Sequence, residues 1–298
     1  MPNLNALSID PTSTRGKILS KVNPDDFAWA LPIMRTGYAG RGLVYLVVAG
    51  LSLWSLFQGG QAQGTKEAFQ SMSDSAWGTF IVGAIVAGMV AYAIWRLIDC
   101  IWDLEAYGTS GKGIIARAGM LVTGLTHLGI GVLAATAMGA LSSSSSGSSG
   151  KSILTRILEW PGGQWIVGIA GVLTVCAAIY YFHKAYAQTY RDTLAANHFT
   201  THWNWLLRVG VAAQGFIVGF IGVLLVYAAL QSDASEVGGL GTLFDWLNSQ
   251  AFGKILVVAL CLGLLAFALF CFVNAFYRVV PKAAGDDVET VSARLRRQ

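Results

Sequence analysis

Six long apolar stretches, separated by polar segments, constrain this sequence more than any other feature. They cover approximately residues 37–58, 78–100, 118–141, 164–186, 208–231 and 252–277. A helix needs about 20 apolar residues to cross the hydrocarbon core of a bilayer, which is about 30 Å thick. Only 12% of the residues are charged, about half the share in soluble domains. We therefore expect an all-α, polytopic membrane protein with six transmembrane helices.

Lysine and arginine are distributed unevenly between the two sides of these spans. Sixteen lie on one side: before or at the start of the first span, around the second and fourth connections, or after the last span. Four lie in the connections on the opposite side. Connections rich in lysine and arginine stay in the cytoplasm, so both termini are expected there. The first thirty residues lack the apolar core of a secretory signal. The first span is therefore expected to remain in the mature protein.

A short pattern opens each odd-numbered span. Each copy has an arginine, a glycine two residues later and a second glycine five residues after that. Seven residues further stands a small residue. The copies are Arg35-Gly37-Gly42-Ala49, Arg117-Gly119-Gly124-Gly131 and Arg208-Gly210-Gly215-Gly222. Steps of seven residues return to nearly the same face of a helix. Small residues let membrane helices approach closely, so we expect each stripe to face a neighbouring helix.

The even-numbered spans repeat as well, when Gly78, Gly163 and Gly253 are aligned. Apolar residues three positions apart precede each glycine, which predicts short amphipathic helices on the outer membrane surface. The chain then divides into an N-terminal cytoplasmic tail (1–33), three two-span units (34–102, 115–188 and 206–278) and a C-terminal cytoplasmic tail (279–298). Internal repeats of this kind are common in membrane proteins.

These repeated residues resemble a bacterial membrane-protein family known as domain of unknown function 1206. The resemblance rests on the Arg-x-Gly-x4-Gly openings, the amphipathic linkers and the aromatic-Gly pairs Trp77-Gly78 and Phe252-Gly253. It covers residues 34–278, although unit two departs from it with Gly163-Gln164-Trp165 and with Met120 where unit one has Tyr38. The resemblance implies a multi-pass protein of the bacterial inner membrane and carries no established activity.

Arg35, Arg117 and Arg208 stand at equivalent positions near the expected cytoplasmic helix ends. Together with the positive ends of the helix dipoles, they could bind phosphate headgroups of anionic lipids in the cytoplasmic leaflet. Asp99 and Lys184 occupy another repeated position near the same side, and Asp99 could neutralise part of the cluster. Simple anchoring of the topology by arginine explains the same residues equally well.

Two polar residues inside the spans are further candidate site residues. His127 is near the middle of the third span, where an ionisable residue suggests a functional site; a neutral histidine hydrogen-bonded within the bundle is the alternative. Gln214 on the fifth span is the other. His183 lies too far along its span to share a haem with His127. His198 and His202 could hold zinc only if helical.

The sequence favours a non-catalytic accessory or scaffold subunit, with anionic lipid as its expected ligand and another membrane protein as a further candidate partner. A small-solute transporter or channel between the repeats is the alternative, and the packing of the central axis distinguishes the two. An enzyme ranks third, because no set of catalytic or metal-binding residues stands out. We expect no cofactor and no metal. A net charge of +4 is too small to indicate a nucleic-acid partner.

Overall fold

The computed structural model describes residues 3–140, 149–233, 239–285 and 288–297, and these fold as helices joined by short connections. Six helices are long and apolar enough to cross a membrane, which confirms the predicted fold class. They are α2 (Ala30–Phe57), α4 (Ala76–Trp102), α5 (Gly111–Ala137), α7 (Gly163–Ala187), α9 (Asn204–Gln231) and α11 (Gly253–Tyr277). The short helices are α1 (Thr14–Leu19), α3 (Thr65–Ser73), α6 (Ser149–Leu158), α8 (His198–His202), α10 (Leu240–Asn248) and α12 (Val291–Arg296).

Several boundaries differ from the sequence prediction; α5 begins at Gly111 rather than at residue 118, and α9 begins at Asn204 rather than at residue 208. Helix α2 begins at Ala30 rather than at residue 37, because Ala30 and Met34 in its first turns are buried against the connection after α4. Helix α5 ends at Ala137 rather than at residue 141. Gly139 follows with a φ of 72°, the left-handed conformation that commonly ends a helix at glycine.

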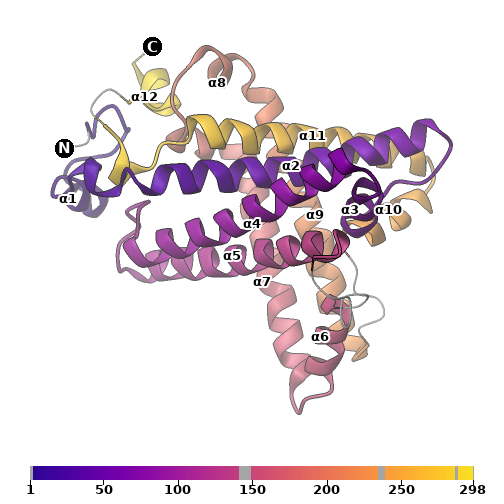
Figure 1. The fold of residues 1–298 in the computed structure, drawn as a ribbon. Helices are drawn as coiled ribbons and strands as arrows, with labels where there is room; N and C mark the ends of the chain where they lie inside the picture. Colours follow the sequence, from indigo (N-terminus) through magenta and orange to yellow (C-terminus); the bar gives the residue numbers. More distant parts are fainter. Residues whose placement is uncertain (1–2, 141–148, 234–238, 286–287, 298) are drawn as a thin grey trace.

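The six long helices pack in the neighbour order α5, α4, α2, α11, α9 and α7. Figure 1 shows α5, α4, α2 and α11 running side by side, with α7 crossing away from them. Both termini lie at the same end of the bundle, which we call the termini end. Helices α5 and α7, although they belong to one unit, share no extended packing interface along their described lengths.

Each small-residue stripe lies against the second long helix of another unit, which is the preceding unit for α5 and α9 and the last unit for α2. The stripe of α5 meets α4, that of α9 meets α7, and that of α2 meets α11. A methyl group added to Gly124 would lie 3.1 Å from Arg96 Cβ, one at Gly215 3.1 Å from Tyr181 Cβ, and one at Gly42 3.0 Å from the Phe272 ring. Gly131 and Gly222 make equally close approaches to α4 and α7, and Ala49 is fully buried. The repeats are therefore linked head to tail.

A second set of small residues joins the two helices within units one and three. A methyl group added to Gly37 would lie 2.6 Å from Tyr92 Cα, and one at the equivalent Gly210 would lie 2.5 Å from the backbone of Ala266 and Phe267. One turn further, α2 and α4 touch through Gly40 and Gly88. Backbone contact of this kind tolerates no side chain without moving a helix.

Unit two lacks this internal contact. A methyl group at Gly119, the equivalent of Gly37, would meet no described neighbour within 4 Å outside its own helix. The positions of the Gly40–Gly88 contact are occupied by Val122 and Leu173, and both side chains are exposed. Branched side chains at both positions leave no room for the backbone approach made in unit one. Unit two therefore stays open between α5 and α7.

The linker helices α3 and α10 turn their apolar sides into the bundle. Phe69 and Phe244 are at most 1% exposed and belong to the largest apolar core cluster, with residues of α2, α4 and α11. The aligned glycines explain how each linker meets the next helix. A side chain at Gly78, Gly163 or Gly253 would overlap a carbonyl oxygen in the last turn of the preceding linker. The linkers therefore help to fill the end opposite the termini.

At the termini end, the chain ends are held by backbone hydrogen bonds. Ala195 in the connection between α7 and α9 donates to Tyr277 O at 2.8 Å, and Ala196 donates to Glu289 O at 2.8 Å. Thr290 donates to Ala6 O at 2.9 Å. The regions expected to be tails thus include segments packed onto the bundle and onto each other.

Candidate functional site

The structure does not bring the three repeated arginines together. Arg35 and Arg208 are exposed. The Nε of Arg117 donates to Cys100 O at 2.6 Å, and its Nη2 donates to Ile101 O at 3.3 Å. Arg117 therefore caps the C-terminus of α4. The arginines stay apart because the three helices that carry them, α2, α5 and α9, share no extended interface with one another. Each of these helices packs on α4, α7 or α11 instead.

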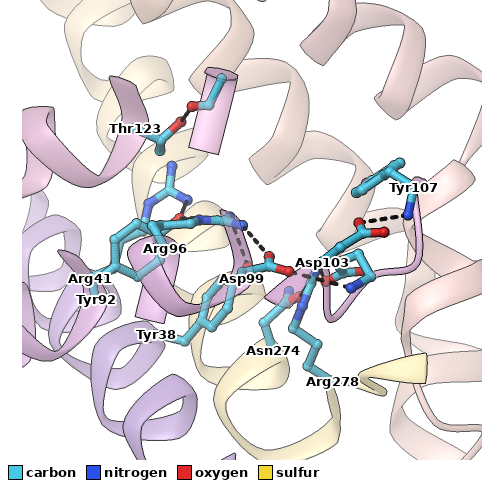
Figure 2. A network of polar contacts seen from close by, with 12 residues as sticks. Tyr38, Arg41, Tyr92, Arg96, Asp99, Asp103, Tyr107, Thr123, Asn274 and Arg278 are labelled. Atoms are coloured by element: carbon cyan, nitrogen blue, oxygen red, sulfur yellow. Dashed lines mark hydrogen bonds and ion pairs between the residues drawn. The ribbon is translucent and has the colours of Figure 1, made fainter. Parts of the chain in front are cut away.

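Other cations gather inside the termini half of the bundle. We call Arg41, Arg96, Lys184 and Arg278 the buried cationic cluster; much of it is visible in Figure 2. Arg96 donates to Tyr92 Oη at 2.9 Å and lies 3.5 Å from the Asp99 carboxylate, which is fully buried. Asp99 thus pairs with Arg96, which is not one of the repeated arginines that Asp99 was expected to neutralise.

Arg278 is held by residues from two distant segments. Its Nη1 donates to Asn274 Oδ1 at 2.9 Å, and its Nη2 donates to Glu105 Oε1 at 2.5 Å. Burial alone would raise the pKa of Glu105, but the charge and hydrogen bond of Arg278 hold that pKa below its ordinary value. Burial opposes the charge on Arg278 as well, yet Glu105 keeps the Arg278 pKa above its usual range. This pair is therefore ionised on both sides.

Arg41 has no such counter-ion. It is 5% exposed, and no carboxylate of the described residues lies within 4 Å of it. Its Nη1 donates to Tyr92 Oη at 3.2 Å, its Nη2 donates to Tyr181 Oη at 3.5 Å, and its Cζ lies 5.0 Å from the centre of the Phe267 ring. Its buried Nε has no partner among the described residues. A buried charge normally requires a paired charge.

Lys184 lies close to Arg41 and also lacks a carboxylate partner among the described residues. Its Nζ lies 5.7 Å from the centre of the Phe270 ring. Phe270 is one turn from Phe267 on α11, and Lys184 is one turn from Tyr181 on α7. Both cations therefore lie beside neighbouring turns of α11 and next to α7, and we call this region the Arg41–Lys184 site.

His127 on α5 lies against Tyr92, the tyrosine whose hydroxyl also accepts from Arg41 and Arg96. Its ring centre lies 4.5 Å from that of Tyr92, and its Nδ1 is 2.7 Å from Thr123 O. The carbonyl can only accept, so Nδ1 carries the proton and the buried Nε2 is left as an acceptor, with no partner among the described residues. His127 is thus placed beside Arg41 and Arg96.

The other predicted polar residues lie elsewhere. Gln214 is 6% exposed, and its Oε1 has no hydrogen-bond partner among the described residues. His198 and His202 stack on α8 with ring centres 4.2 Å apart, and the Nδ1 of His202 lies 3.0 Å from His198 O. The rings face each other rather than a common metal position.

Sequence reasoning missed Arg41 as a site residue because it was assigned only to membrane orientation. The signal that could have found it is its register. Arg41 stands at the repeat position of Thr123 and Gln214, well inside the first helix, where a charge needs a partner. Its tyrosine and phenylalanine partners come from α4, α7 and α11 and become neighbours only in the folded bundle.

Comparisons with known proteins agree with the repeated architecture. The family described as Domain of Unknown Function (DUF1206) matches residues 36–103, 118–188 and 209–278. The uncharacterized protein YxxB of Bacillus subtilis (strain 168) is 23% identical over 270 residues, which cover 89% of this chain and 98% of that protein. No solved structure matches the chain. With three matched segments that each contain one two-helix unit, the chain belongs to the DUF1206 family.

Proposed function

We propose that this protein is a non-catalytic accessory subunit of the bacterial inner membrane that binds an oxyanion at the Arg41–Lys184 site. This proposal rests mainly on Arg41, which is buried and has no carboxylate of the described residues within 4 Å. Two neighbouring cations without a counter-ion, flanked by tyrosine hydroxyls, suit a phosphate group. A phosphate can come from an anionic lipid or from a free solute.

A scaffold role is supported by the packing of the bundle half away from the termini. The largest core cluster fills this region with apolar side chains of α2, α4, α10 and α11. Val48, Ile85 and Leu264 in it are at most 1% exposed. A dense apolar core favours a structural bundle over a wide water-filled channel.

The binding test compares the thermal stability of purified wild-type protein with that of Arg41→Gln and Lys184→Gln. A ligand at one hundred times its dissociation constant stabilises the folded state by about 2.7 kcal/mol. We expect the melting temperature of the wild type to rise with short-chain phosphatidylglycerol or with inorganic phosphate. This rise should vanish in both variants and persist in Arg35→Gln, which removes an exposed arginine of the same helix.

The two ligand sources are distinguished by which probe works. Stabilisation by phosphatidylglycerol alone identifies a lipid ligand, and stabilisation by inorganic phosphate identifies a solute. If neither probe stabilises the wild type, or if Arg41→Gln responds as the wild type does, the proposed site is wrong.

Anion transport is the second candidate, and the open side of unit two favours it. Helices α5 and α7, which do not close on each other, contribute His127 and Tyr181 to the surroundings of Arg41. A solute could approach the Arg41–Lys184 site through the opening between α5 and α7. Proteoliposomes loaded with radiolabelled phosphate test this candidate. Transport predicts phosphate release that Arg41→Gln abolishes, whereas the accessory role predicts release no faster than from protein-free vesicles.

A further inference from the structure

A second site lies on the outer side of the bundle, between α4 and α5. An open groove of about 250 Å³ runs along this pair, and its two walls are apolar and largely exposed. The walls consist of Val90, Ile94 and Leu97 from α4 and Leu121, Leu125 and Leu128 from α5, and Arg96 also lines the groove beside Gly124. Gly124 and Ala93 leave room at the floor because their side chains are small or absent. From Val90 to Leu97 the groove follows α4 for about 10 Å.

The groove ends beside cations at the termini end. Arg117 continues the α5 wall one turn beyond Leu121, and it reaches across to the last carbonyls of α4. Lys282 donates to Trp102 O at 2.7 Å at the same helix end, and Lys112 is exposed at the start of α5. The nearby Asp103 carboxylate faces inward, accepting from Tyr107 N and Gly108 N at 2.8 Å each. The groove therefore combines a hydrocarbon-like channel with a positive end.

We infer that this groove binds one anionic phospholipid, with an acyl chain between α4 and α5 and the phosphate beside Arg117. Apolar walls open to the membrane match a hydrocarbon chain, and the charge at the end matches an anionic headgroup. Arg117 was expected from sequence to meet a headgroup as part of an arginine trio. Here Arg117 meets it alone, one turn beyond the Leu121 end of the groove. Arg96 of the buried cationic cluster lines this groove, but Arg41 and Lys184 do not, so the groove is distinct from the Arg41–Lys184 site.

Native mass spectrometry of the full-length protein tests this inference, with phosphatidylglycerol and phosphatidylcholine of identical acyl chains as probes. We expect the wild type to retain one phosphatidylglycerol in preference to phosphatidylcholine. Ala93→Phe places a ring in the groove and should abolish retention. Arg117→Gln should weaken phosphatidylglycerol binding about fivefold, the effect of one charge at a lipid surface.

Matched controls use equivalent changes away from the groove. Ala170→Phe adds the same ring to the exposed face of α7, and Arg208→Gln removes the exposed repeat equivalent of Arg117; neither should alter retention. Should Ala93→Phe fail to fold, Leu125→Trp obstructs the groove from its exposed wall. The inference is overturned by equal binding of both lipids, or by unchanged retention in the groove variant. Loss of lipid in Arg41→Gln alone would assign the bound lipid to the Arg41–Lys184 site instead, so the two proposals fail separately.

Discussion

Gly37→Leu is expected to destabilise the protein severely, whereas Gly119→Leu at the equivalent position of unit two should be tolerated. A side chain at Gly37 would meet the α4 backbone, since even a methyl group lies 2.6 Å from Tyr92 Cα. Overpacking of this kind costs about 3 kcal/mol when a helix must move. At Gly119 the same side chain would enter open space beside α5.

Thermal unfolding of both variants in detergent measures this difference. We expect the melting temperature of Gly37→Leu to fall by roughly 5–10 °C, and that of Gly119→Leu to stay within about 2 °C of the wild type. Equal losses in both variants would show that α5 and α7 pack against each other in the purified protein, contrary to the open unit two described above.

Glu105→Gln should also have a large effect on stability. Glu105 is 1% exposed and forms an ion pair with Arg278, which joins the connection after α4 to the end of α11. Removing one partner of a buried pair leaves the other charge uncompensated and costs about 3–5 kcal/mol. Glu289→Gln is the matched control, because its partners Arg294 and Arg297 are largely exposed and such pairs contribute about 1 kcal/mol or less.

The stabilisation by Glu105 has a defined pH dependence. Its pKa in the folded protein is lowered from the ordinary 4.5, so the folded state favours the carboxylate. The contribution is complete above about pH 4.5 and is lost as the pH falls through the lowered pKa. Melting curves from pH 7 to 3 should therefore show the wild type converging on Glu105→Gln. A gap that widens on acidification would contradict this assignment.

Much of the architecture could be predicted because lipid leaves few choices for a backbone. Apolar length fixes the number of helices, and the threefold pattern around Gly42, Gly124 and Gly215 marks faces that later lie against neighbours. What the pattern did not contain was the identity of those neighbours. A stripe predicts a close approach to some other helix. Only the folded chain shows that α5 and α9 meet the preceding unit and that α2 meets the last unit.

The opening of unit two shows why equivalent positions need separate examination. Gly119 retains the contact glycine of units one and three. The deciding residues are Val122 and Leu173, which replace the small pair Gly40 and Gly88 one turn away. Their bulk is visible in the sequence, but its consequence depends on which residues face each other across the unit.

The candidate site could be predicted only in part. Asp99 and Lys184 were expected near the same side of the membrane from their shared repeat position. In the structure Asp99 pairs with Arg96, and Lys184 lies beside Phe270. The exposed arginines Arg35 and Arg208 looked equivalent to Arg117, yet their surroundings differ completely. Arg41 lacked a repeated charge, and its unpaired state became evident only from the carboxylates placed elsewhere.

The most direct measurement for the central claim is an electron cryomicroscopy map of the protein in lipid nanodiscs. The account predicts non-protein density between the Arg41 guanidinium and the Lys184 ammonium group, within hydrogen-bonding distance of both. Its size would show whether the bound oxyanion continues into an acyl chain. A map in which a carboxylate of this chain contacts Arg41, or in which the Arg41–Lys184 site holds no non-protein density, would contradict the proposed oxyanion binding.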